Sequence, residues 1–267
     1  MVQRNYLLPG VFVLGLALPV VGEVRSKGEG MTREDIYKAV QSLSREKDLF
    51  AASEFVIGLE SESEIVAAYG NLVLDCYWKA KSTEQVLHFA NAGIHYSLAR
   101  AARYDGKDDD SAKKLRFAAK RMATDAASCT WIGWEEPGIA ISPDQMRQGL
   151  AMARYSVRQL HELDPSAVQL AFTYWFLGAH HIALESYGEA LSVFAQARDY
   201  SKAHGSKPDE LAMLEGYIGL TRILKGEKDV GESEFSSSVS ALESRENQDA
   251  EFYAKQLLSV RAFFAKQ

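Results

Sequence analysis

Histidine and glutamate residues in the middle of the chain have the spacing of a helical metal site. His180 and His181 are adjacent, and Glu185 follows His181 by one helical turn, so both side chains would share a helix face. The sequence offers no third ligand beside them. His161 is followed by Glu162 but lacks the second histidine that a zinc protease helix requires. The pattern therefore favours buried histidines, and we expect no metal and no cofactor.

Other residue types that could do chemistry are sparse. The acidic turn 105–110 lacks the alternating acids and central glycine of an EF-hand loop, so it is more typical of a solvated helix start. Cys76 and Cys129 are the only cysteines; the pair permits a disulfide in an exported chain, while buried thiols are equally compatible with the pattern. Nucleophile motifs and phosphate-binding glycine loops are absent. The sequence predicts no catalytic residue.

Composition narrows the class of protein. The chain has 267 residues, of which 47% are hydrophobic and 25% charged, as in ordinary globular proteins, which argues against disorder. The formal net charge of -6 argues against nucleic acid as a partner.

The N-terminus has the pattern of an export signal. Residues 1–22 combine Arg4, an apolar run from Tyr6 to Val21 and small residues before Glu23, so we expect a signal peptide followed by a linker, 23–31. Proline and glycine interrupt the run, which is shorter than the roughly 20 residues that span a bilayer. We expect a periplasmic or secreted protein. The alternative is a chain anchored in a membrane by an uncleaved N-terminal segment.

From Thr32 onward the chain predicts a series of helices. Thr32, Ser61, Ser82 and Ser142 each precede an apolar run of helical period and are typical N-cap residues. Between the helices, residues 129–141 form one long stretch without helical period, with Trp131 and Trp134. This stretch is either a binding loop or a segment whose rings pack over the neighbouring helices.

The stretch 171–204 resembles one tetratricopeptide (TPR) repeat, a helical hairpin of about 34 residues. The residues that carry the resemblance are Tyr174, Leu177, Gly178, Tyr187, Ala190, Phe194 and Ala197. Aligning Ala212 with Ala171 places Gly219 at the position of Gly178 and Phe235 at that of Phe194, as in a second, degenerate repeat. The resemblance implies an all-α, TPR-like α-solenoid of antiparallel helical hairpins, with a C-terminal capping helix after Asn247. We expect degenerate hairpins over 32–130 and TPR-like repeats with the capping helix over 131–267.

In proteins of that family the first helix of each repeat lines a groove for the partner. The corresponding residues are Phe172, Trp175, Ala179, Ile182, Met213, Gly216, Leu220 and Ile223. They are apolar, which suits an amphipathic helix or an apolar peptide. The alternative is that the N-terminal helices cover this face.

A second resemblance points to an enzyme. Glu185-Ser-Tyr187 resembles the start of the lytic transglycosylase catalytic motif, but the Gly-Leu-Met-Gln segment of that family does not follow. We therefore expect a non-catalytic protein–protein interaction module or scaffold of an exported or envelope assembly, with another protein or a peptide as its partner. Peripheral association with a membrane and the oligomeric state stay open. The alternative is an enzyme or small-ligand-binding protein on an α-α scaffold, with a pocket near Trp131 and Trp134.

Overall fold

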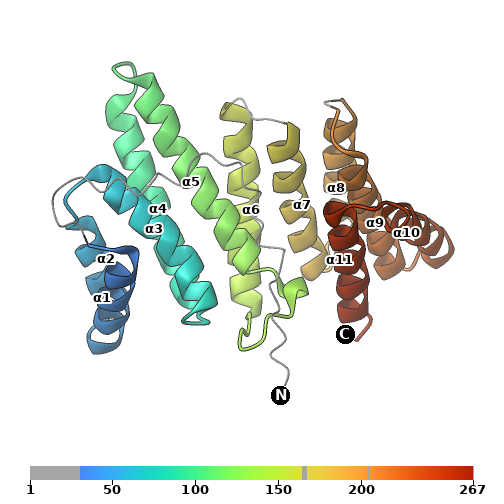
Figure 1. Cartoon of the computed structure of the whole chain (residues 1–267), viewed down its shortest axis with the longest axis horizontal. Helices are drawn as coiled ribbons and strands as arrows, with labels where there is room; N and C mark the ends of the chain where they lie inside the picture. The colour runs from blue at the N-terminus through green and yellow to red at the C-terminus, as the bar shows by residue number, and fades with distance from the viewer. Residues whose placement is uncertain (1–30, 164–166, 204, 267) are drawn as a thin grey trace.

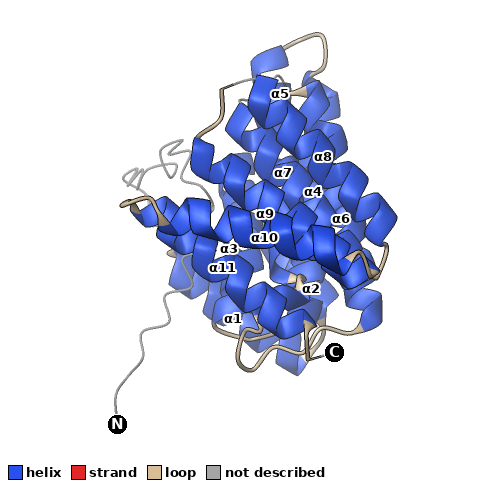
Figure 2. Ribbon diagram, turned by 90° about the vertical axis from the view of Figure 1, so that its right-hand side faces the viewer, coloured by secondary structure: helices blue, strands red, loops and turns tan. Residues whose placement is uncertain are grey.

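The protein is all-helical in the part of the chain that the computed structural model describes, residues 31–163, 167–203 and 205–266. These residues form eleven α-helices and one short 3-10 helix, η2, and no strand (Figure 2). The predicted signal peptide, 1–22, lies outside the described residues, as does the linker except for Met31. The α-helices are α1 (Arg33–Glu46), α2 (Leu49–Ile57), α3 (Glu62–Trp78), α4 (Thr83–Tyr104), α5 (Asp109–Cys129), α6 (Pro143–Glu162), α7 (Ala167–Ala183), α8 (Tyr187–Ala203), α9 (Pro208–Lys225), α10 (Lys228–Glu243) and α11 (Gln248–Phe264), and η2 spans Ile132–Trp134.

The predicted N-caps begin these helices. Thr32, Ser61 and Ser142 form full capping boxes, in which the cap hydroxyl and the third helical side chain each satisfy a backbone amide. Ser82 caps α4 with its hydroxyl only, because the amide oxygen of Gln85 accepts a hydrogen bond from Gln41 at 2.7 Å instead. Cap bonds join residues three apart, which is why the local sequence predicts them.

Helices α1 to α10 follow one another broadly in chain order across Figure 1, and each described helix packs against the next. Contacts also skip one helix: α1 meets α3, α3 meets α5, α5 meets α7 and α7 meets α9, while α2 meets α4 and α4 meets α6. The described chain therefore has an odd-numbered layer from α1 to α9 and an even-numbered layer from α2 to α6. Buried side chains of both 32–130 and 131–267 belong to one continuous core, and the predicted division at 130 stays a prediction.

Two helix pairs approach closely at glycines. A Cβ atom at Gly178 of α7 would lie 2.6 Å from the Phe194 ring of α8, and one at Gly219 of α9 would lie 2.6 Å from the backbone nitrogen of Phe235 in α10. Phe194, with Ala190 and Ala197, is completely buried. The residues that carry the TPR resemblance thus lie where α7 meets α8.

The last helix, α11, packs against α9, α10 and η2. Its buried residues are Ala250, Tyr253, Ala254, Gln256, Leu257 and Val260. In Figure 1 it turns back from α10, the helix farthest to the right, and lies to the left of α9 and α10. None of the described helices is long and apolar enough to cross a bilayer.

Candidate functional site

The residues predicted to line a groove lie on α7 and α9 and are mostly inaccessible. Trp175 is 1% exposed and Leu220 0%, and Ala179, Ile182 and Met213 are also buried. Phe172 and Ile223 are partly buried. A partner could reach the buried side chains only if the elements that cover them moved, so binding through these residues stays a prediction.

The tryptophan stretch and α11 both contribute cover, and of the N-terminal helices named in the alternative above, α5 packs against α7. The Trp131 and Trp134 rings lie 5.4 Å and 5.8 Å from the Trp175 ring, measured between centroids. On α9, a Cβ atom at Gly216 would lie 2.4 Å from Cδ1 of Leu257, so α11 contacts α9 directly there. Contacts within the chain therefore cover part of the α7–α9 face, the surface formed by the residues predicted to line the groove.

The tryptophan stretch is anchored through its indole groups. Trp131 is 1% exposed and donates from Nε1 to the carbonyl oxygen of Ala179 at 3.2 Å. Trp134 is half-buried and donates to the carbonyl oxygen of Ser128 at 2.9 Å. Satisfied indole N–H groups and edge-to-face or tilted ring contacts agree with a packing role for this stretch, the second of the two alternatives.

A small hollow of about 190 Å³ adjoins the tryptophan stretch and is lined partly by Glu135 and Glu136. Both carboxylates are engaged: Glu136 pairs with Lys81, and Glu135 lies 3.5 Å from Lys266. This is where the alternative enzyme or ligand pocket would lie.

The histidine pair belongs to the core. His180 Nε2 lies 2.9 Å from the carbonyl oxygen of Ala127, so this nitrogen carries the proton and donates. Burial lowers the pKa of His180 to about 4 and also lowers that of His181. The helix ends at Ala183, and Glu185 lies exposed in the following turn with a φ of 56°. The one-turn relation of His181 to Glu185 therefore does not arise on a continuous helix. No three His, Cys, Asp or Glu side chains of the described residues are grouped to hold a metal ion.

The cysteines are free, buried thiols in the structure. Burial raises the pKa of Cys76 to about 12 and raises that of Cys129 as well. Both groups are therefore protonated near neutral pH and are poor nucleophiles.

Two ionisable side chains of α5 are buried, which the sequence did not indicate. Lys120 is 7% exposed, and burial lowers its pKa to about 8. Burial raises the pKa of Asp125 to about 6, and Oδ2 of this residue has no hydrogen-bond partner, with Nε of Arg121 at 3.7 Å. These side chains lie within the helix packing, away from the hollows.

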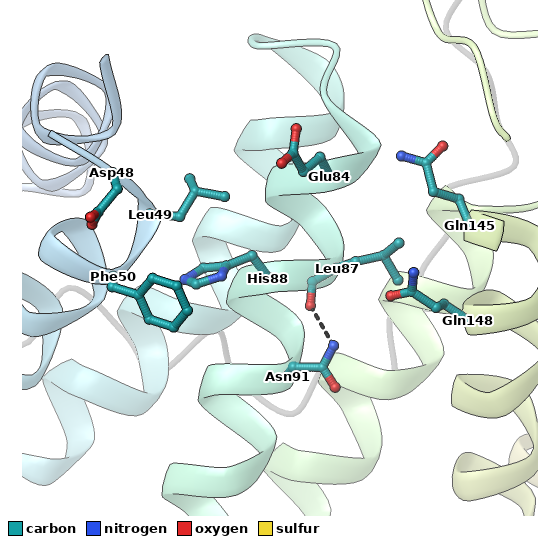
Figure 3. A pocket seen from close by; sticks show the side chains of 9 residues that line it. All are labelled: Asp48, Leu49, Phe50, Glu84, Leu87, His88, Asn91, Gln145 and Gln148. Carbon is teal, nitrogen blue, oxygen red and sulfur yellow. Dashed lines mark hydrogen bonds between the residues drawn. The ribbon is translucent and has the colours of Figure 1, made fainter. Parts of the chain in front are cut away.

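A further recess, which sequence reasoning missed, lies across the even-numbered layer (Figure 3). We call it the α2–α4–α6 hollow; its volume is about 460 Å³, within the range of about 300 to 1,000 Å³ typical of ligand clefts. Its lining consists of Asp48, Leu49 and Phe50 at the start of α2, Glu84, Leu87, His88 and Asn91 on α4, and Gln145 and Gln148 on α6.

Phe50 is the distinctive residue of this hollow. It is 75% exposed, the highest value among the large apolar side chains that are exposed in the described chain. Its ring meets His88 edge to face, with centroids 5.4 Å apart. His88 Nε2 lies 2.8 Å from the Ser53 hydroxyl, which links α4 to α2. The sequence signal for an exposed Phe50 is weak: in the apolar segment 49–57, Phe50 and Ile57 lie two helical turns apart and so on one helix face. Both side chains are exposed in the structure.

Comparison with known proteins does not assign this chain: no family model matches it, and no curated protein matches it. The α2–α4–α6 hollow, the covered α7–α9 face and the tryptophan stretch are therefore the features from which a function can be argued.

Proposed function

We propose that the chain is an exported, TPR-like helical scaffold without catalysis of its own, and that another protein docks on the α2–α4–α6 hollow. The observation that carries this proposal is the exposure of Phe50 at the edge of a recess formed by three helices.

The helix packing supports a repeat architecture. Alternating layers and close glycine contacts in two successive helix pairs, at Gly178 and Gly219, are what stacked hairpins require. Each hairpin has an apolar face that its neighbours must cover, so hairpins stack into an extended array. Such arrays have long surfaces that bind partners. We propose that α11 is the capping element, because it buries its apolar residues on α9 and α10.

The partner surface is placed on α2, α4 and α6 because the α7–α9 face is covered. Burying a large exposed aromatic side chain against a partner is favourable, and aromatic residues dominate the binding energy of many interfaces. The adjoining recess offers the partly buried Leu49 for apolar contact and amides for hydrogen bonds. The location outside the cytoplasm rests on residues 1–22, whose pattern is that of a signal peptide.

Site-specific photo-cross-linking tests the proposal. A photoreactive phenylalanine analogue would replace Phe50 in one variant and Val230 in a control variant, since Val230 is an apolar residue on α10 that is 51% exposed. We expect a discrete cross-linked species in cells that produce the first variant, absent from the second. Equal patterns from both positions, or no product from position 50, would contradict docking at the hollow.

A further inference from the structure

The chemistry of the α2–α4–α6 hollow points to a particular kind of partner residue. We infer that the hollow receives an arginine side chain of the partner protein, with the guanidinium group over Phe50 and beside Glu84. This inference rests on the proposed function, since it names the group that the interaction scaffold recognises.

The charge of the lining is one-sided. Asp48 and Glu84 are both exposed acids, and none of the nine lining residues is Lys or Arg. One carboxylate oxygen of Asp48 accepts the amide hydrogen bond of Ala51 at 2.7 Å, while no ion pair to Glu84 occurs within the described residues. His88 adds no positive charge near neutral pH, because burial lowers its pKa. The recess is therefore complementary to a cation.

The carboxylates stand beside an aromatic surface. In Figure 3, Asp48 and Glu84 lie above the rings of Phe50 and His88, on two helices that face one another across the recess. Both carboxylates interact electrostatically with His88, and the His88 ring contacts Phe50. A cation that stacks on Phe50 therefore lies in the same recess as both acids.

Arginine fits this arrangement better than lysine. Its planar guanidinium stacks on aromatic rings and donates two parallel hydrogen bonds to a carboxylate, whereas the ammonium group of lysine is compact and strongly hydrated. Helices α4 and α6 supply amides for the partner backbone. Asn91 donates to the carbonyl oxygen of Leu87 at 2.9 Å, which leaves its own amide oxygen to accept, and Gln148 is exposed.

The test uses small probes on the full-length protein. N-acetyl-arginine amide would be titrated while the NMR signals of Phe50, His88 and the Asn91 side-chain amide are followed. N-acetyl-citrulline amide serves as the neutral probe of nearly the same shape, and N-acetyl-lysine amide as the other cation. We expect saturable shifts at these residues with the arginine probe, and weaker binding of both other probes. Equal affinity for citrulline would overturn the role of charge, and equal affinity for lysine would overturn the choice of arginine.

Two matched variants locate the charge. Glu84→Gln should weaken binding of the arginine probe about tenfold, the effect of losing one charge-assisted hydrogen bond. Glu189→Gln, an exposed acid in the first turn of α8, should leave it unchanged. An unaltered affinity in Glu84→Gln would refute the site.

The two proposals can fail separately. Cross-linking of a protein at position 50, with no response to the arginine probe, would leave the scaffold function standing and remove the arginine inference. Binding of the probe without any cross-linked protein would remove the proposed docking function and leave a site with affinity for a guanidinium group.

Discussion

The approach of α9 to α10 predicts that a single methyl group at Gly219 destabilises the protein. In Gly219→Ala the added Cβ would lie 2.6 Å from the backbone nitrogen of Phe235 and 2.9 Å from the carbonyl oxygen of Gly231. Both atoms belong to backbone, so the helices must separate. Overpacking of this kind costs about 1 to 3 kcal/mol, and the better helix propensity of alanine offsets about 1 kcal/mol of it. We expect a net loss of up to about 2 kcal/mol in the free energy of unfolding.

Gly70→Ala provides the matched control, because Gly70 lies within α3 and a Cβ atom there meets no atom within 4 Å. This variant should gain about 1 kcal/mol from helix propensity. Urea denaturation would measure both variants, and thermal melting should show a shift of about 2 to 4 °C per kcal/mol. Equal stabilisation of the two variants would refute the close approach of α9 and α10, and with it the principal support for stacked hairpins.

Three further predictions concern buried groups and the N-terminus. Burial raises the pKa of Asp125 from 3.8 to about 6, so the folded state favours the protonated carboxyl and stability falls as pH rises through that range. Between pH 4 and pH 7, Asp125→Asn should therefore gain up to about 3 kcal/mol in the free energy of unfolding relative to the original protein, as measured by urea denaturation at both pH values. Replacing Trp175 and Leu220 together by serine should abolish the helical circular dichroism, because each lost side chain is buried and costs roughly 2 to 5 kcal/mol, while the whole free energy of unfolding of a protein is about 5 to 15 kcal/mol. A stable variant that no longer binds its partner would instead support an open groove. Protein purified from the cells that make it should begin near Glu23 on terminal sequencing, and an intact Met1 would contradict removal of a signal peptide.

Local interactions explain what the sequence could predict. The hydrogen bonds of the Thr32, Ser61 and Ser142 caps join residues near one another in the chain, and the apolar period marks each helix independently of its surroundings. The glycine and phenylalanine of α7 and α8 were also predictable as a pair, since they lie on consecutive helices.

Contacts between segments that are distant in the chain explain what the sequence could not predict. An apolar face such as that of Trp175 has the same sequence pattern whether a partner or the chain itself covers it, and only the fold brings Trp131 to it. Lys120 lies beside the apolar stripe of α5, but this helix has neighbours on several sides, so the flank is buried too. The α2–α4–α6 hollow depends on which side chains the fold leaves exposed, as it does Phe50, and the helical period of the sequence does not show this.

The contact between α11 and η2 has a consequence for how the chain assembles. Most helices pack on their neighbours in sequence, so they can form early and one after another, as expected where contact order is low. The tryptophan stretch is synthesised well before α11, so the surfaces of η2 and α9 that α11 contacts stay uncovered until α11 has formed. A nascent chain, or one truncated before α11, therefore exposes apolar surface that the folded protein conceals, and such exposure favours aggregation.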